Sequence, residues 1–385
     1  MRFIVSKERL ELAVKNICRV IEPKQPLPIL QDILFDVNDK FATLTGSDTE
    51  VQLQFEVVLN DAAEGGGKFC VNAQRLMDAL APLKEQPVTI TANTEDAEMV
   101  RFELKHESGC TFFPIENADE YPVMADPEHK DLTGNMVMPA KSVAQAIQSC
   151  LWTTSNDDLR PIMNGICFDL EKDKCFIVAS DGHTLMRFDE ICGSEGGNFV
   201  IPKKVAKILT RLMTWDEDDD IYMEWSENLC LANQEGWRMI FRLIEGKYPQ
   251  YDAVIPKDHP FYCVADRADL LSSIQMVAPF SPDSSNMITW AIRRSEIMMT
   301  GNNDEFDMGA VDTIKTEADN LNDENIVIGL KASKISGILS KMPYPKIIIR
   351  FNTPDRAIVF EEKRDTSEKP STNHLLGLSM PMLTD

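Results

Sequence analysis

Apolar residues recur at helical spacing in six stretches of the chain. In each stretch they stand three and four residues apart, which places them on one face of an α-helix. The six predicted helices cover 6–21, 72–84, 139–155, 202–213, 266–280 and 331–342. Their starts are 66, 67, 63, 64 and 65 residues apart, which indicates six units of nearly equal length.

Short runs rich in β-branched and aromatic residues separate the helices. Residues 175–179 (CFIVA), 346–351 (KIIIRF) and 357–360 (AIVF) are three such runs, and their composition predicts β-strands. One helix and several strands in each unit predict an α+β fold.

A longer repeat of 133 residues links the first and second thirds of the chain. The residues Pro-Ile-Leu, Ile, Phe and Asp of 28–36 return as Pro-Ile-Met, Ile, Phe and Asp in 161–169. Ser47-Asp48 likewise returns as Ser180-Asp181, and a fainter third copy follows at 300–303. Repetition on this scale predicts a modular, quasi-symmetric assembly.

The formal net charge of −23 argues at first against a nucleic-acid partner. The distribution of charge reverses that conclusion, because the six helical stretches, the first counted to residue 24, carry +10 and the rest carries −33. In the fourth helix, Lys204, Lys207 and Arg211 lie opposite the apolar face. Such a stripe is either a solvated helix face or a surface for sequence-independent contact with phosphates, and its recurrence favours duplex DNA.

Other sequence features narrow the class of protein. Nine cysteines without paired spacing indicate small buried side chains in a reducing compartment. The sequence has no apolar run of signal-peptide or membrane-spanning length, which predicts a cytoplasmic protein with no membrane partner. Five scattered histidines predict no metal site, and we expect no cofactor. The glycine run 65–67 with Lys68 lacks the other residues of a phosphate-binding loop and predicts a flexible hairpin.

Ser180-Asp181-Gly182-His183 is the stretch that suggests an enzyme. Neighbours in sequence do not make a catalytic triad, and Ser47-Asp48 recurs without the histidine, which favours a turn at the end of a strand. Two alternatives to a DNA-binding protein stay open at this point. One is an uncharacterised hydrolase that uses this segment, and the other is an acidic scaffold whose lysine stripes bind acidic proteins or a membrane surface.

Three stretches carry a resemblance to a known family: 160–166 (RPIMNGI), 178–185 (VASDGHTL) and 241–256 (FRLIEGKYPQYDAVIP). Together with 27–30, 200–204 and 380–382, they resemble the bacterial DNA sliding clamps, the β subunits of DNA polymerase III, in order and over essentially the whole chain.

The resemblance implies a DNA replication processivity factor, a non-catalytic accessory subunit that needs no cofactor. It implies three domains of similar fold, each with two helices packed on antiparallel sheets, which we place at 1–127, 128–256 and 257–385. A head-to-tail homodimer would close a ring of six domains around duplex DNA, with the helices lining the hole. For the dimer interface, the resemblance points to Phe112 or Phe113 on one chain and Phe280 on the other.

The resemblance also implies two binding sites. Family residues that face DNA correspond to Lys24, Arg75, Lys203 and Lys204, and helix phase adds Lys207, Arg211, Lys331, Lys334 and Lys341. A groove for short hydrophobic peptides of the polymerase catalytic subunit, the clamp loader, other polymerases and repair proteins is implied between the middle and last domains. Its residues carry over as Arg160, Met163, Ser180, Gly182, His183, Leu185, Pro249, Val254, Leu378, Met380, Pro381 and Met382.

The composition of this groove suits one site that accepts several related peptides, because flexible methionines adapt to different side chains. Ordinary core packing is the alternative interpretation of each apolar member taken alone. Thr184 stands where an arginine is common in the family, and the chain ends in Leu383-Thr384-Asp385 rather than in a basic residue. We therefore expect the charge of the groove rim to differ from that of the family.

Overall fold

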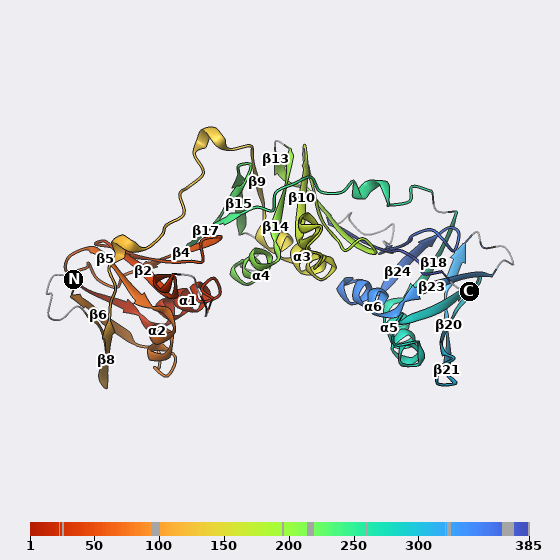
Figure 1. Cartoon of the computed structure of the whole chain (residues 1–385), viewed down its shortest axis with the longest axis horizontal. Coiled ribbons are helices and arrows are strands. Elements are labelled where there is room, and N and C mark those ends of the chain that lie inside the picture. The colour runs from red at the N-terminus through yellow and green to blue at the C-terminus, as the bar shows by residue number, and fades with distance from the viewer. Residues whose placement is uncertain are drawn as a thin grey trace. The chain divides into compact units, whose positions relative to one another are not determined.

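The computed structural model describes residues 1–22, 24, 27–93, 101–194, 196–213, 219–258, 260–319, 321, 325–363 and 373–383. The chain forms two compact units, whose elements are labelled in Figure 1. The first unit comprises Met1–Ala140 and Lys207–Leu243, and the second comprises Lys141–Ala206 and Ile244–Asp385.

Six α-helices occur in the described residues, at the six places that the apolar periodicity predicts. They are α1 (Lys7–Ile17), α2 (Ala73–Leu80), α3 (Ala140–Cys150), α4 (Lys203–Leu212), α5 (Arg267–Val277) and α6 (Ala332–Lys341). Their starts at 7, 73, 140, 203, 267 and 332 reproduce the predicted spacings of 66, 67, 63, 64 and 65 residues. Within the described ranges, no helix is long and apolar enough to cross a membrane.

Capping residues explain where several helices begin. The side-chain oxygens of Ser6, Asn72 and Asp266 accept hydrogen bonds from N–H groups in the first turns of α1, α2 and α5. Each such cap contributes about 1 kcal/mol to helix stability.

Each helix ends earlier than predicted. Residues 18–20 after α1 form turns, while α3 and α5 pass into the 3₁₀ helices η4 (Leu151–Thr153) and η7 (Ala278–Phe280). Other 3₁₀ helices are η1 (Pro28–Gln31), η2 (Ala118–Glu120), η3 (His129–Asp131), η5 (Pro161–Asn164) and η6 (Tyr251–Ala253).

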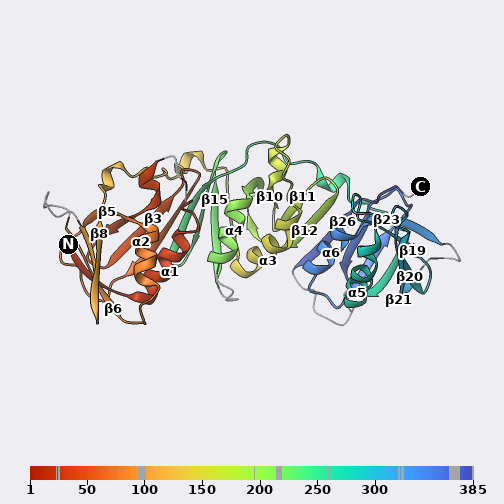
Figure 2. The same ribbon diagram turned by 60° about the horizontal axis from the view of Figure 1, so that its bottom comes forward.

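The first unit contains two antiparallel sheets. Its strands are β1 (Arg2–Ser6), β2 (Asp32–Val37), β3 (Phe41–Ser47), β4 (Val51–Val58), β5 (Gly67–Asn72), β6 (Pro87–Asn93), β7 (Arg101–His106), β8 (Gly109–Pro114), β9 (Gly134–Pro139), β15 (Asp220–Trp225), β16 (Leu229–Gln234) and β17 (Trp237–Arg242). One sheet has the order β1-β6-β7-β8, and the other contains the run β9-β15-β16-β17-β4-β3-β2-β5. Helices α1 and α2 lie side by side in front of these strands (Figure 2).

The second unit repeats this plan. Its strands are β10 (Gly165–Glu171), β11 (Lys174–Ser180), β12 (Thr184–Glu190), β13 (Gly193–Ser194), β14 (Gly197–Pro202), β18 (Phe261–Asp266), β19 (Met287–Ile292), β20 (Glu296–Asn303), β21 (Met308–Lys315), β22 (Glu317–Asp319), β23 (Ile326–Lys331), β24 (Lys346–Phe351), β25 (Ile358–Glu362) and β26 (His374–Ser379). The longer sheet runs β14-β10-β11-β12-β26-β25-β24-β18-β22, and the shorter runs β21-β20-β19-β23. Helices α5 and α6 pack side by side. The α+β class is confirmed.

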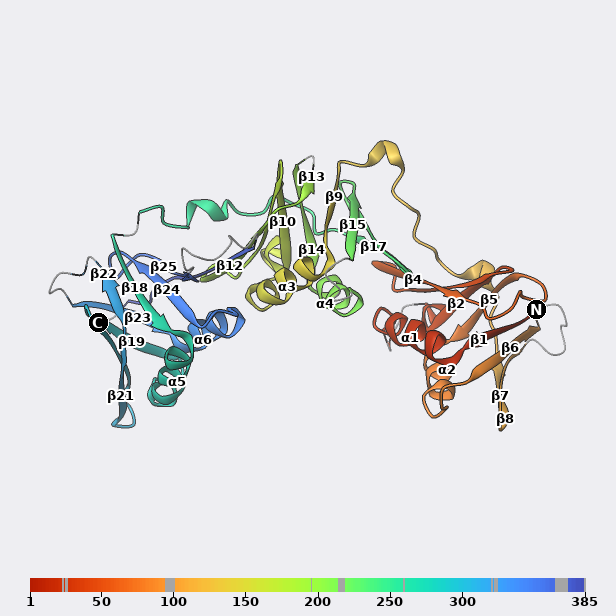
Figure 3. The same ribbon diagram turned by 180° about the vertical axis from the view of Figure 1, so that it is seen from behind.

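Within each unit, the longer sheet joins strands from two successive repeats. In the first unit β4 pairs with β17, with Leu53 opposite Met239. In the second unit β12 pairs with β26, with Leu185 opposite Leu378. In each junction, one partner is the third strand after the first helix of a repeat. The other partner is the last strand of the repeat that follows. The strands at the same two positions in the remaining repeats are β21 and β8. Among the described residues, each is an edge strand of one of the two shorter sheets (Figure 3).

Phe112 and Phe113, both predicted for the dimer interface, are neighbours on β8 and point to opposite faces of its sheet. Successive side chains of a strand point to opposite faces. Phe113 is 8% exposed and its ring stacks on Phe102 at 4.9 Å between centroids, whereas Phe112 is 62% exposed. The ring of Phe112 is therefore available at the surface, whereas the ring of Phe113 packs in the core. Their assignment to the dimer interface stays a prediction.

The predicted hairpin at 65–68 is wrong. Gly67 begins β5, which pairs with β2, whereas the preceding strand β4 pairs with β3 and β17. Gly65 and Gly67 have φ angles of 87° and 154°. These glycines supply backbone angles that L-residues rarely adopt, so they turn the chain into β5 rather than close a hairpin.

Candidate functional site

A cavity of about 200 Å³ lies in the second unit, beside the paired strands β12 and β26. It is lined by Arg160, Met163, Ser180, Gly182, His183, Thr184, Leu185, Tyr248, Pro249, Gln250, Tyr251, Val254, Leu378 and Met380. Ten of the twelve predicted groove residues are among them. The structure therefore brings together side chains from four separate parts of the sequence.

Two predicted groove residues, Pro381 and Met382, do not line this cavity. The N–H of Met380 donates a 2.8 Å hydrogen bond to the carbonyl of His183. The N–H of Met382 donates a 2.8 Å hydrogen bond to the carbonyl of Gly329 in β23. The terminal segment is thus attached first to the cavity rim and then to the neighbouring sheet.

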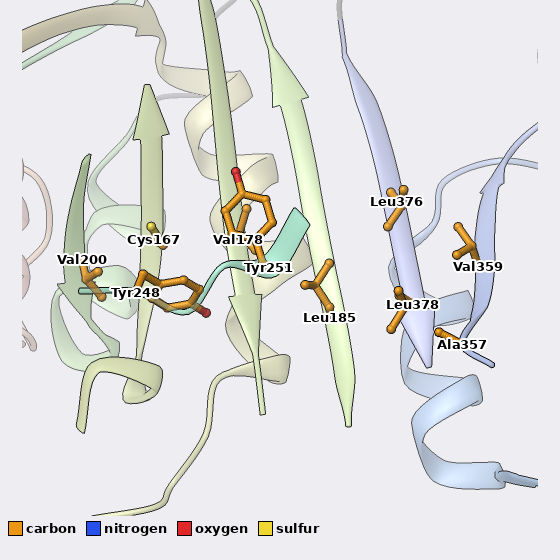
Figure 4. Close-up of a cluster of buried hydrophobic side chains, with 10 residues drawn as sticks. All are labelled: Cys167, Val178, Leu185, Val200, Tyr248, Tyr251, Ala357, Val359, Leu376 and Leu378. Carbon is orange, nitrogen blue, oxygen red and sulfur yellow. The ribbon is translucent and has the colours of Figure 1, made fainter. Parts of the chain in front are cut away.

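The floor of the cavity is part of a buried apolar cluster. Leu185 on β12 and Leu378 on β26 face each other in register and are each 2% exposed. Figure 4 shows these leucines together with Tyr248 and Tyr251, which reach the same cluster from the segment 244–257. We call this segment the connector. Core packing and cavity lining are therefore compatible roles for the same leucines.

The rim of the cavity is apolar but open to solvent. Val254 is 50% exposed and Met380 is 39% exposed. Exposed apolar side chains around a recess are typical of a surface that receives apolar groups of a ligand.

The connector supplies a wall that the sequence interpretation identified only in part. It predicted Pro249 and Val254, whereas Tyr248, Gln250 and Tyr251 also line the cavity. The hydroxyl of Tyr248 accepts a 3.1 Å hydrogen bond from the N–H of Ser180. The sequence feature that could have indicated them is the pair of tyrosines three residues apart, because large aromatic side chains in a loop usually pack against the domain surface.

The turn from β11 to β12 forms another wall. The hydroxyl of Ser180 donates to the carbonyl of Thr184 at 2.9 Å and accepts from the N–H of Gly182 at 3.1 Å. Oδ1 of Asp181 accepts from the N–H groups of His183 and Thr184 at 2.9 and 2.7 Å. Gly182 has a φ of 89°, which favours glycine. The predicted strand-end turn is confirmed, and it uses the side chains of Ser180 and Asp181, two of the three polar side chains that suggested a hydrolase.

The charge at the rim is carried by Arg160, whose Nε lies 2.9 Å from Oδ2 of Asp157. The hydrogen bond from Arg160 lowers the pKa of Asp157. Because Arg160 is exposed and lines the cavity, it remains placed to meet a carboxylate of a bound ligand.

The predicted DNA-contact residues differ in exposure. The exposed set is Lys24, Arg75, Lys207, Arg211 and Lys341, and the partly buried set is Lys203, Lys204, Lys331 and Lys334. On α4 the apolar residues opposite the stripe are buried, as helix phase predicts, and they are Val205, Ile208, Leu209 and Leu212. The ammonium of Lys203 donates a 2.6 Å hydrogen bond to the carbonyl of Ser155, so this side chain is held against the protein backbone.

One further cationic residue, Arg19, was missed. Burial lowers its pKa, and the nearby charge of Arg211 lowers it further. Arg19 lies beyond the end of α1, where helix phase no longer predicts its direction. Two cations held close together attract a polyanion, so Arg19 extends the candidate DNA surface of the first unit.

Comparison with known proteins agrees with this architecture. The family model of the DNA polymerase III beta subunit N-terminal domain matches residues 1–125, and that of the central domain matches residues 137–250. The two models together match more than half of the chain. This chain belongs to the bacterial DNA polymerase III beta subunits, the sliding clamps. It is therefore a processivity clamp of DNA replication and a non-catalytic accessory subunit.

Curated sliding clamps are similar over nearly their whole length. The beta sliding clamp of Pseudomonas aeruginosa is 25% identical over 373 residues, which cover 95% of this chain and 98% of that protein. The beta sliding clamp of Haemophilus influenzae is 22% identical over 371 residues, which cover 95% of this chain and 97% of that protein.

Solved sliding-clamp structures share the fold. The crystal structure of a DnaN sliding clamp from Pseudomonas aeruginosa bound to griselimycin has a TM-score of 0.90 at 22% identity and covers 100% of both chains. The DNA polymerase sliding clamp of Bacillus subtilis has a TM-score of 0.86 at 19% identity, also over 100% of both chains. The sliding-clamp fold predicted from the sequence is confirmed.

Proposed function

We propose that the cavity beside β12 and β26 is the groove through which this sliding clamp tethers the replicative polymerase and other DNA-processing proteins. The observation that carries the proposal is the convergence of Met163, Leu185, Val254, Leu378 and Met380 on one open apolar recess. The partner is a short peptide with two or three large apolar side chains, because most of the exposed surface of the recess is apolar, although Arg160, His183 and Gln250 also line it.

Titration of the chain with a fluorescent peptide from the polymerase catalytic subunit tests this function. We expect saturable binding and competition by an unlabelled peptide from the clamp loader, since one groove serves both. A scrambled peptide of the same composition is the control. Equal binding of the two peptides would contradict the proposed groove.

We further propose that the exposed cationic residues of the helices contact duplex DNA without reading its sequence. The exposed Lys207 and Arg211 on α4, with Arg19 beside them, favour this role because flexible or forked cations suit a moving phosphate backbone. A clamp of this kind stays on DNA by encircling it and needs only weak contacts. The acidic remainder of the chain discourages binding by the wrong face.

Ring closure follows from the quasi-symmetry of the sheets. The pairings β4–β17 and β12–β26 imply that β21 of one chain pairs with β8 of a second chain. Exposed apolar residues at this position on β8 and on the β20–β21 hairpin favour that contact; they are Phe112, Phe306, Met308 and Val311. Phe280, 36% exposed in η7, was predicted for the same interface. Two such contacts close a head-to-tail dimer.

The three domains of this dimer's subunit are proposed at 1–127, 128–256 and 257–385. The positions of the helix pairs favour this division, because each range contains two of the six helices. We place the protein in the cytoplasm with the replication machinery, and its action needs no cofactor.

A further inference from the structure

Lys334 does not project freely from α6, although the sequence assigns it to the DNA surface. Its ammonium donates a hydrogen bond to Oδ2 of Asp181, a residue 153 positions away. It also lies 5.9 Å from the centroid of the Trp152 ring. The side chains of Lys334 and Asp181 are 28% and 17% exposed. This ammonium is therefore held between a carboxylate and an aromatic ring.

Asp181 is the residue that links α6 to the groove. One of its carboxylate oxygens accepts from Lys334, and the other accepts from the N–H groups of His183 and Thr184. Burial alone would raise the pKa of Asp181, but these hydrogen bonds outweigh burial and lower it. The carboxylate is thus ionised at neutral pH, when it serves both partners.

Trp152 fixes the position of α6 relative to that turn. Gly337 lies one turn beyond Lys334, and a Cβ atom on Gly337 would come within 2.5 Å of the Trp152 ring. The ring therefore contacts the helix backbone at Gly337 and the ammonium at Lys334. Since both contacts lie on one face of α6, the helix cannot turn Lys334 toward another partner without losing this packing.

We propose that Lys334 is a positioning residue of the peptide groove and not a DNA contact. Through Asp181 it holds the backbone of Gly182 and His183, which line the cavity. This inference rests on the proposed peptide-binding function. It gives α6 a role in partner binding that its lysine content does not suggest.

Two substitutions separate the ion pair from the turn. Asp181→Asn keeps an oxygen that accepts from the turn N–H groups but removes the charge that faces Lys334. Lys334→Met keeps an apolar stem against Trp152 and removes the ammonium. A partly buried charge that loses its partner is poorly solvated, so each single variant leaves one strained group and the double variant leaves none.

The test measures two dissociation constants of the full-length chain, one for the fluorescent polymerase peptide and one for short duplex DNA. We expect Lys334→Met and Asp181→Asn each to weaken peptide binding by about fivefold or more. The double variant should weaken binding by less than the product of the two single effects. Lys334→Arg should restore most of the peptide affinity, while affinity for short duplex DNA stays unchanged in all variants.

The matched control is Lys341→Met, which removes an exposed cation from the end of the same helix. It should leave peptide affinity unchanged. Wild-type peptide affinity in Lys334→Met, or loss of affinity for duplex DNA with peptide affinity intact, would overturn the inference. If the wild-type chain itself fails to bind the peptide, the groove proposal fails first and this inference with it.

Discussion

The hydroxyl of Tyr251 donates a 2.7 Å hydrogen bond to Oδ2 of Asp169. This bond fastens the connector to β10, at the point where the connector also forms a wall of the groove. Burial raises the pKa of Tyr251, and the carboxylate of Asp169 raises it further, so the phenol stays protonated as a donor. A second attachment lies next to it, where Arg187 pairs with Asp252 at 3.2 Å. The shape of the groove therefore depends on Asp169 and Arg187, which hold the connector but do not line the cavity.

Replacement of Tyr251 by phenylalanine should loosen the connector. A hydrogen bond to a charged acceptor contributes about 1.5–3 kcal/mol, so the free energy of unfolding should fall by about that amount. Peptide affinity should fall as well, because the wall that carries Pro249 and Val254 loses its anchor. Thermal unfolding and peptide titration measure the two effects.

Tyr222→Phe is the control for this change, since Tyr222 donates to Glu224 on the exposed face of β15 in the first unit. It should change the free energy of unfolding by no more than about 0.5 kcal/mol and should leave peptide affinity unchanged. Equal behaviour of the two variants would show that the connector does not depend on Asp169.

Deletion of residues 380–385 should abolish peptide binding. It removes Met380 from the groove and also the hydrogen bonds of Met380 and Met382 to His183 and Gly329. Deletion of 383–385 alone keeps those bonds and should retain most of the affinity. Sedimentation should show a dimer in both truncated chains. Unchanged affinity after the longer deletion would exclude the C-terminal segment from the site.

Asp32 predicts a pH dependence of stability in the first unit. Burial raises its pKa from 3.8 to about 6. Between these values the folded chain holds a proton that the unfolded chain has lost, so the contribution of Asp32 to stability falls as pH rises from about 4 to about 6. Asp32→Asn keeps an oxygen that accepts a hydrogen bond from Asn72. As pH rises over this range, the free energy of unfolding of the variant should therefore increase relative to that of the wild type by about 1–2 kcal/mol.

Melting temperatures of the two chains at pH 4 and pH 7.5 measure this effect. The variant should be more stable relative to the wild type at the higher pH. A difference that does not change between the two pH values would mean that Asp32 titrates normally in the folded chain.

The cationic stripe of α4 predicts a salt-dependent loss of DNA contact. Reversal of Lys207 and Arg211 to glutamate should lower affinity for short duplex DNA and reduce the salt slope by about 0.9 per lost phosphate contact. Binding at several salt concentrations measures this slope. Lys105→Glu, an exposed lysine on β7, is the control. An effect of equal size in the control would show that net charge, rather than the stripe, governs binding.

Much of the fold was predictable because local patterns determine it. The six helices follow from apolar periodicity, and the strands β11, β24 and β25 follow from β-branched and aromatic runs. Tertiary contacts were harder to predict. Helix phase gives the face of α6 on which Lys334 lies, but nothing local shows that Asp181 meets it.

The groove shows the same division. The family resemblance predicted residues in the strands and the turn, and Pro249 and Val254 in the connector. It did not predict Tyr248 and Tyr251, because the connector has no periodicity that shows which way their side chains point. The interface prediction named both Phe112 and Phe113, because only the pairing of β8 with β7 shows which of the two side chains faces the core.

The central claim is that this clamp stays on DNA by encircling it. The direct measurement loads the labelled chain onto nicked circular DNA with its clamp loader, then cuts the circle once and follows the bound fraction. The account predicts that the clamp remains on the intact circle and is lost from the linear molecule through its free ends. Equal retention on circular and linear DNA would contradict it.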